Sequence, residues 1–294
     1  MTSATVLAAL CVYATRWEPY HPKLRRREVR VPASWPALNI LHVSDLHLRR
    51  GDERLLRAQR EILARVSPAP DIVCATGDMC ERFEDVSLVT EVLEVVRPRL
   101  GTFAVLGNHE YDAPPPAALR MGWGGITWRV FRLIFPRALS RGPADADAIA
   151  ASLADSGIGV LRNDGTRVHI GEHSLWVAGS DSVWAGRMNL ARAMCGRRPD
   201  EGALALVHEP EAAFAAVRNG ADLVLAGHTH GGQVRLPGVG ALYYHRVDHR
   251  LHVAAGFQRV NGIPLHITAG LGQLLALRLL CPPEAVLLRC TPSD

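Results

Sequence analysis

The segment LAGHTHGGQVRLPG, Leu225 to Gly238, places two histidines one residue apart between an apolar run and a pair of glycines. A short apolar run of this kind is typical of a buried β-strand, and a strand projects alternate side chains to the same side. His228 and His230 can therefore face one common object. Two converging imidazoles favour a metal ion, although an HxH pair alone is also compatible with ordinary strand-end histidines.

Four other segments share this local architecture, in which a short apolar run stops at residues that can bind a metal. NILHVSDLHL reaches Asp45 and His47, DIVCATGDMC reaches Asp78, GTFAVLGNHE reaches Asn108 and His109, and LALVHEP reaches His208. Ligand sites in open α/β sheets lie beyond the carboxyl ends of the strands. We therefore predict an α/β fold with one metal site at the carboxyl ends of its strands.

The donor set indicates which chemistry the site performs. The set contains nitrogen and oxygen donors without thiolate, and its seven members are too many for one tetrahedral ion. They are Asp45, His47, Asp78, Asn108, His208, His228 and His230. Two ions fit, with a shared carboxylate between them and a bridging water that becomes a hydroxide nucleophile near neutral pH. Such a pair also holds the oxygens of an in-line displacement at phosphorus, so phosphate-ester hydrolysis is favoured. Mn, Fe, Zn and Co are all compatible with these donors.

The ordered series SDLH, TGD, LGNHE, LVHEP and AGHTHGGQ resembles the signature of the calcineurin-like metallophosphoesterases over about residues 38–232. The resemblance implies a four-layer αββα sandwich of two mixed β-sheets flanked by helices. It also implies roles for single residues. Asp45, His47 and His230 would hold one ion, Asn108, His208 and His228 would hold the other, and Asp78 would bridge them. His109 would stabilise the transition state or protonate the leaving oxygen, with a hydrogen bond that only supports the ligands as the alternative.

The tail GIPLHITAGLGQLLALRLLCPPEAVLLRC and the early RWEPY are similar to bacterial members that are often membrane-anchored or exported. Those members have been linked to phosphodiester or UDP-2,3-diacylglucosamine hydrolysis. The classical UDP-diacylglucosamine hydrolase has arginine where this chain has His109, which favours a general phosphodiesterase acting on a lipid or nucleotide diester. A zinc amidohydrolase or β-lactamase-type hydrolase is disfavoured because glycines follow His230. A non-catalytic metal-binding scaffold is disfavoured because every expected ligand type is present.

Composition places the chain among globular proteins with a large core. It has 294 residues, is 48% hydrophobic and 21% charged, and carries a net charge of +4. The mildly basic balance fits anionic substrates or a membrane surface and does not require specific nucleic-acid binding. We predict an N-terminal apolar and basic segment over 1–30 and a metallophosphoesterase domain over 31–294. The six cysteines have no CxxC spacing and are expected to be free thiols.

Two segments suggest a membrane. SATVLAALCVYAT is apolar but shorter than the roughly 20 residues of a spanning helix, and a basic cluster from Arg16 to Arg27 follows it. Residues 113–143 interleave aromatic residues with arginines and contain no acidic residue, which is typical of a membrane-surface helix or a lid. We expect membrane association on the cytoplasmic side, with an exported or cell-surface location as the alternative. A simpler alternative is that the two segments pack on the domain.

Further elements follow from periodicity and turn residues. We predict helices over 52–66, with Asp52 as N-cap, over 84–98 and over 210–220. The runs 174–182, 266–272 and 284–290 are expected to form strands of a second sheet. Gly77, Gly107 and Gly227 each precede a ligand, where the absence of a Cβ permits close approach of the backbone.

Overall fold

The computed structural model describes residues 3–111, 145–242, 250–273 and 275–293. Two six-stranded mixed sheets form its centre. The first sheet has the strand order β1-β14-β2-β3-β4-β5. Its strands are β1 (Lys23–Val31), β2 (Leu38–Val43), β3 (Ile72–Thr76), β4 (Gly101–Val105), β5 (Ile158–Val160) and β14 (Glu284–Pro292). Strands β2 to β5 run parallel, so the carboxyl ends of β2, β3 and β4 meet at one edge.

The second sheet has the order β12-β13-β9-β8-β7-β6. Its strands are β6 (Asp164–Ile170), β7 (His173–Gly179), β8 (Gly202–Leu206), β9 (Leu223–Ala226), β12 (Gly256–Val260) and β13 (Ile263–Ile267). The inner strands β7, β8, β9 and β13 are parallel, and the two edge strands are antiparallel to their neighbours. A small hairpin, β10 (Arg235–Leu236) with β11 (Gly240–Ala241), stands apart from both sheets.

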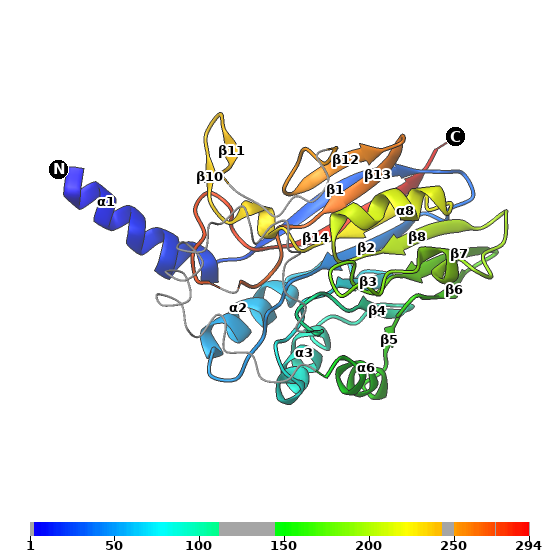
Figure 1. The fold of residues 1–294 in the computed structure, drawn as a ribbon, viewed down its shortest axis with the longest axis horizontal. Coiled ribbons are helices and arrows are strands. Elements are labelled where there is room, and N and C mark those ends of the chain that lie inside the picture. The colour runs from blue at the N-terminus through cyan, green and yellow to red at the C-terminus, as the bar shows by residue number, and fades with distance from the viewer. Residues whose placement is uncertain (1–2, 112–144, 243–249, 274, 294) are drawn as a thin grey trace.

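The inner strands β2, β3, β8 and β9 are buried on both faces, and their sequences are accordingly almost continuous apolar runs rather than alternating ones. Ile40 and Ile72 point into the core between the two sheets, where they pack with Leu204 and Leu223. Their neighbours along the chain, such as Leu41, point outward into a second core beneath the helices of the first sheet. A third core lies between the second sheet and its own helices. The predicted four-layer αββα sandwich is confirmed (Figure 1).

Helices α2 (Glu53–Leu63), α3 (Val86–Leu93) and α6 (Ala146–Asp155) cover the first sheet, and α7 (Leu190–Ala193) and α8 (Ala213–Arg218) cover the second. Asp52 caps α2 as predicted, because its side chain accepts a hydrogen bond from the backbone N–H of Leu55 at 3.1 Å. The helix predicted over 84–98 is shorter than expected. The one predicted over 210–220 begins as a 3₁₀ turn and ends before Gly220, whose φ is +92°.

One expectation needs correction. The run 284–290 does form a strand, but β14 lies in the first sheet, between β1 and β2, rather than in the second. Its register places Val286 beside His42 and Leu288 beside Ile40, so its apolar side chains complete the first sheet. The predicted boundary at residue 30 falls inside β1, which pairs with β14 along its whole length. The predicted insertion at 113–143 lies outside the described residues.

The chain begins with α1 (Ser3–Val12), which continues through the short turns Tyr13–Trp17 and Glu18–Tyr20 into β1. Figure 1 shows α1 projecting away from the two sheets. Within the ranges that the structure describes, no helix combines the length and the apolar character needed to cross a membrane.

Candidate metal centre

All eight residues singled out in the sequence come together at the carboxyl ends of five strands. Asp45 and His47 follow β2, Asp78 follows β3, and Asn108 and His109 follow β4, all in the first sheet. His208 follows β8, and His228 and His230 follow β9, in the second sheet. Every one of these side chains is buried. The space between the sheet edges is therefore lined by imidazole, carboxylate and amide groups from both sheets.

A first group consists of Asp45, His47 and His230, with one candidate ligand atom each within 4.8 Å of the others. The Nε2 atoms of His47 and His230 lie 3.2 Å apart, and the ring planes are nearly parallel, at 22°. Nε2 of His230 is 3.5 Å from Oδ1 of Asp45. Two buried imidazole nitrogens directed at one another beside a carboxylate form a donor set that suits a divalent cation.

A second group consists of Asp78, His208 and His228. Oδ2 of Asp78 lies 3.1 Å from Nε2 of His208, and Nδ1 of His228 lies 3.2 Å from the same His208 nitrogen. The side-chain oxygen of Asn108 is 3.1 Å from Nδ1 of His228 and brings an amide oxygen to the same point. Nδ1 of His208 bonds the carbonyl oxygen of Thr76 at 2.7 Å, which directs Nε2 toward Asp78.

Asp78 lies between the two groups. The Oδ2 atom that contacts His208 in the second group is also 3.9 Å from Nε2 of His47 in the first. Backbone hydrogen bonds beyond the strand ends fix this arrangement, because the N–H of Asp45 donates to the carbonyl of Gly77 and that of His47 donates to the carbonyl of Asp78. The loop after β2 is thereby held in register with the loop after β3.

The electrostatics of Asp78 and His208 reflect their contact. Burial by itself opposes ionisation of Asp78, but the nearby imidazoles of His109 and His208 outweigh it and hold the pKa of Asp78 well below its usual range. Burial likewise opposes charge on His208, yet Asp78 raises the pKa of that imidazole well above its usual value. Asp78 is therefore an anionic oxygen donor at neutral pH, the form that binds cations.

Several residues at the site adopt backbone conformations that are rare for residues other than glycine. Five of the candidate ligands have positive φ in the left-handed region. They are Asp45 (52°), His47 (45°), Asp78 (52°), His228 (70°) and His230 (50°). Strain of this kind concentrates at functional sites, where the surrounding structure enforces it. We expected extended backbone to present His228 and His230 to one side. The positive φ values show that a tight turn after β9 presents them instead.

The glycines before the candidate ligands allow the close approach that we predicted. A Cβ on Gly107 would clash with the Asp78 carboxylate and would lie 2.7 Å from its backbone nitrogen. A Cβ on Gly77 would lie 2.6 Å from Nδ1 of His208, and one on Gly227 would lie 2.5 Å from Oδ2 of Asp45. These three glycines let the loops of the two sheets approach within contact of the ligands.

Residues 38–232, which carry every one of these groups, match the family described as calcineurin-like phosphoesterase. The chain belongs to this family. Its members are phosphoric ester hydrolases that use divalent metals, and the two clusters described above are the candidate ligands for them in this chain.

Three relatives of this calcineurin-like phosphoesterase are similar over most of their length. Phosphodiesterase YaeI of Escherichia coli (strain K12) is 28% identical over 251 residues, which cover 85% of this chain and 80% of that protein. The uncharacterized metallophosphoesterase YkoQ of Bacillus subtilis (strain 168) is 26% identical and covers 80% of this chain and 77% of its own. The UDP-2,3-diacylglucosamine pyrophosphatase LpxG of Chlamydia muridarum (strain MoPn / Nigg) is 24% identical, covering 95% of this chain and 92% of its own.

Glu81 is part of the centre of this phosphoesterase and was not foreseen from the sequence. Its Oε1 atom lies 2.8 Å from Nδ1 of His47, and its Oε2 atom lies 3.0 Å from Nδ1 of His109. One carboxylate thus orients both rings and leaves their Nε2 atoms directed toward Asp78, at 3.9 and 3.8 Å from Oδ2. The available signal was an acidic residue three positions after Asp78, because ligand histidines commonly pair with a carboxylate.

Glu110 supports the site through the backbone. Its fully buried carboxylate accepts hydrogen bonds from the N–H groups of Gly107 (2.8 Å), Asp78 (3.1 Å) and Met79 (2.5 Å). Burial, followed by the charge of Asp78, raises the pKa of Glu110 to about 7. The residue joins the loop after β3 to the loop after β4 and thereby fixes Asp78 relative to Asn108.

An aromatic wall borders the second group. The ring of Trp184 stands edge-on to His228, with ring centroids 4.3 Å apart. Glu209, the residue after His208, accepts hydrogen bonds from the backbone N–H groups of Val183 (3.0 Å) and Trp184 (3.2 Å) and holds this wall in place. No spacing rule connects Trp184 with His228 along the sequence.

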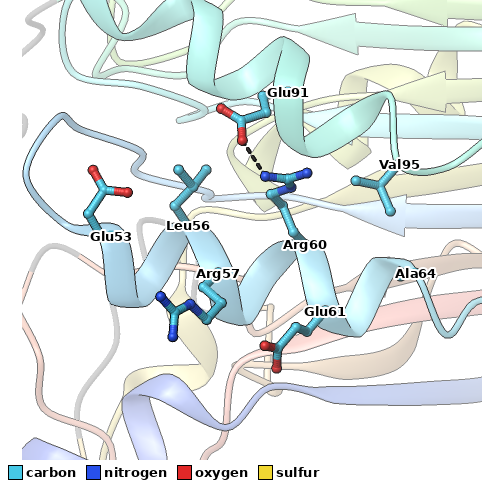
Figure 2. Close-up of a pocket in the computed structure, with 8 residues that line it drawn as sticks. All are labelled: Glu53, Leu56, Arg57, Arg60, Glu61, Ala64, Glu91 and Val95. Atoms are coloured by element: carbon cyan, nitrogen blue, oxygen red, sulfur yellow. Dashed lines mark hydrogen bonds and ion pairs between the residues drawn. The ribbon is translucent and has the colours of Figure 1, made fainter.

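A hollow of about 440 Å³ lies elsewhere, between α2 and α3 (Figure 2). It is lined by Glu53, Leu56, Arg57, Arg60, Glu61, Ala64, Glu91 and Val95. The ion pair of Arg60 with Glu91, at 2.5 Å, crosses one side of it. None of the candidate metal ligands contributes to this hollow, and it plays no part in the centre.

Proposed function

We propose that this phosphoesterase hydrolyses a phosphodiester bond with the help of two divalent ions. Asp45, His47 and His230 would hold one ion, and His208, His228 and Asn108 the other. The observation that carries the proposal is the position of Asp78, whose Oδ2 atom faces His208 of one group at 3.1 Å and His47 of the other at 3.9 Å. When bound, two such ions would supply a water of lowered pKa as nucleophile and would stabilise the negative charge that develops on the oxygens around phosphorus.

The protein's own contribution begins with preorganisation. The ligands are buried and are held in strained backbone conformations, so little rearrangement is needed when a substrate arrives. Hydrogen bonds to Nδ1 orient two of the imidazoles. The carbonyl oxygen of Thr76 contacts Nδ1 of His208, and the carboxylate of Glu81 contacts Nδ1 of His47. Such outer contacts fix the tautomer and increase the basicity of the ligand.

His109 is the proposed acid. Its Nδ1 atom is bound by Glu81 and its Nε2 atom faces the centre, 3.8 Å from Oδ2 of Asp78. A proton on Nε2 can therefore pass to the oxygen that leaves phosphorus, and the carboxylate of Glu81 stabilises the charged ring before the transfer.

The diester preference draws support from the similarity to a relative named phosphodiesterase. A second candidate is hydrolysis of a lipid-linked pyrophosphate, because relatives named UDP-2,3-diacylglucosamine pyrophosphatase align with almost the whole chain. His109 stands where the classical enzyme of that activity has arginine, so we place the general phosphodiesterase first.

The test compares bis(p-nitrophenyl) phosphate with p-nitrophenyl phosphate as substrates for protein reconstituted with manganese. We expect faster cleavage of the diester and about two metal ions per chain by elemental analysis. Asp78→Asn should lose turnover and bind fewer ions. Binding of a single ion with full activity would contradict the two-ion proposal, and no cleavage of either ester or of UDP-2,3-diacylglucosamine would contradict the enzymatic one.

A further inference from the structure

Among the residues that the structure describes, most of the large exposed apolar side chains lie in one region. Of thirteen such residues in the described ranges, eleven belong to the N-terminal helical segment, to the β10–β11 hairpin or to the loop 275–280. In the hairpin, Leu236 is 39% exposed, Val239 69% and Leu242 55%, and in the loop Leu277 is 39% and Leu280 52% exposed. We call these three segments together the apolar face.

Hydrogen bonds join the three segments into one surface. The N–H of Arg278 in the loop donates to the carbonyl of Ala14 at the end of the helical segment, at 2.8 Å. The N–H of Arg235 in the hairpin donates to the carbonyl of Leu279, and the N–H of Leu279 donates to Gln233, both at 2.9 Å. Figure 1 shows the hairpin above the base of α1, on the side from which α1 projects.

One residue of this surface is held outward against its backbone preference. Leu280 has a φ of +54°, which is a costly conformation for a bulky side chain. The buried carboxylate of Glu18 enforces it by accepting hydrogen bonds from the N–H groups of Leu280 (2.9 Å) and Cys281 (2.5 Å). The fold thus holds Leu280 in an unfavourable backbone conformation with its side chain exposed to solvent. This points to a function for the exposed side chain.

Helix α1 is uncharged and presents mostly apolar side chains on every side. Its sequence SATVLAALCV contains no charged residue, and its described side chains, Ala4 to Val12, are all exposed. A helix that is apolar all round is typical of a core or a membrane rather than of a protein surface. Ten residues rise about 15 Å, which is about half of the roughly 30 Å hydrocarbon thickness of a bilayer. The helix therefore has the length to enter one leaflet.

The charges beside the apolar face fit anionic lipid. Residues 3–27 include Arg16, Lys23 and the run Arg25 to Arg27 but a single acidic residue, Glu18, which is buried. Residues 230–242 and 275–283 contain no acidic residue at all. Lys23 lies next to the loop, because its N–H bonds the carbonyl of Pro283. Apolar side chains flanked by basic residues without exposed carboxylates match a bilayer with a negative surface potential.

The apolar face is continuous with the metal centre. The turn His230–Gly232 leads directly into the hairpin, and the buried guanidinium of Arg278 donates to the carbonyl of His230 at 3.3 Å. We propose that the apolar face docks on an anionic lipid bilayer, with α1 in one leaflet and the hairpin and loop among the headgroups. The metal centre then acts on phosphodiesters held at the membrane surface, a consequence that rests on the proposed function.

The experiment measures cosedimentation of the full chain with vesicles of phosphatidylcholine, with and without phosphatidylglycerol. The variant Val239→Ser/Leu242→Ser/Leu280→Ser removes exposed apolar side chains without altering the centre, and Met188→Ser, at an apolar residue that is 38% exposed outside the apolar face, is the control. We expect binding to the anionic vesicles to exceed binding to neutral ones. The triple variant should lose at least about tenfold in partitioning, and Met188→Ser should bind like the unmodified chain.

Equal sedimentation of the triple variant and the unmodified chain would overturn the docking surface. So would a dimer in light scattering that the triple variant abolishes without any vesicle binding, because the apolar face would then cover a second copy. Hydrolysis of bis(p-nitrophenyl) phosphate in solution, measured on the same samples, separates the two proposals. Cleavage without vesicle binding would contradict only the membrane inference. Vesicle binding without cleavage under any metal would contradict only the proposed function.

Discussion

The Nδ1 atom of His109 lies 3.0 Å from Oε2 of Glu81, which makes the proposed acid of the centre one half of a carboxylate–imidazole pair. The other carboxylate oxygen is 2.8 Å from Nδ1 of His47. Glu81 therefore ties the orientation of the acid to the orientation of a proposed metal ligand, so that a change at Glu81 acts on both functions together.

Glu81→Gln should reduce kcat and the affinity for one metal ion by about 10- to 100-fold, because an amide cannot accept from both rings in the same way. Metal titration followed by bis(p-nitrophenyl) phosphate hydrolysis measures both effects. Glu81→Asp should restore part of the loss. Glu84→Gln is the control, because it makes the same substitution at an exposed glutamate three residues after Glu81. It should leave both kcat and the metal affinity unchanged. An unaltered metal affinity in Glu81→Gln would show that the pair does not position His47.

His109→Ala should lower kcat by about 100-fold or more while two ions still bind, since the proposed role is proton transfer and not ligation. The loss should be smaller for esters with p-nitrophenolate, which leaves readily without protonation, than for alkyl diesters. Comparison of the two leaving groups, with metal content by elemental analysis, checks this. An equal loss for both substrates would argue against His109 as the acid.

Gly107→Ala tests the close approach of the loops. A Cβ at this position would meet the backbone nitrogen of Asp78 at 2.7 Å, and overpacking of this kind costs about 1–3 kcal/mol in the free energy of unfolding. We expect loss of activity together with a lower Tm. Gly157→Ala is the control, because Gly157 has a φ of +80° and open space around its Cα. That variant should lose stability through backbone strain but keep activity, and equal activity in both variants would contradict the steric explanation.

The gathering of the candidate ligands could be predicted because each follows a buried strand within a few residues, and parallel strands bring their carboxyl ends together. Asp78 and His208 illustrate this, since one apolar run before each was enough. Glu81 was missed because its partner His109 is 28 residues away, at a distance set by packing of the loops. The placement of β14 was wrong for a similar reason. A run such as 284–290 indicates a strand, but nothing local indicates that it pairs with β2, which is more than 240 residues earlier.

Glu201 gives a prediction about pH. Arg167 lowers the pKa of this carboxyl to about 2, with help from Ser174 and the backbone N–H of Arg198. Because the folded pKa lies below the ordinary value of 4.5, the stabilisation is complete above about pH 4.5 and is lost as the pH falls toward 2. Urea midpoints between pH 6 and 3 should therefore fall less steeply for Glu201→Gln than for the unmodified chain.

Asp200→Asn removes the neighbouring exposed carboxylate and is the control for this series. Its urea midpoints should follow those of the unmodified chain at every pH. If Glu201→Gln showed the same pH dependence as this control, the contact of Glu201 with Arg167 would contribute nothing to acid sensitivity.

Arg278 links the apolar face to the centre through backbone carbonyls. Its buried guanidinium donates to the carbonyl oxygens of Gly272 (2.6 Å), Ala269 (2.9 Å), Cys281 (3.2 Å) and His230 (3.3 Å). Burial lowers the pKa of Arg278, although the group remains a cation. A planar fork of five N–H donors can satisfy four fixed acceptors at once, which the three donors of an ammonium group cannot do.

Arg278→Lys should therefore reduce the free energy of unfolding by about 2–4 kcal/mol, because buried carbonyls lose their donors. It should also lower the affinity for the ion that Asp45, His47 and His230 would hold. Metal added in limiting amounts should then fill the other site of each chain first. Chemical denaturation and metal titration measure the two effects. Arg289→Lys, at a residue with a 71% exposed side chain, is the matched control and should change neither. Loss of stability with two ions still binding equally would show that Arg278 supports the fold but does not position His230.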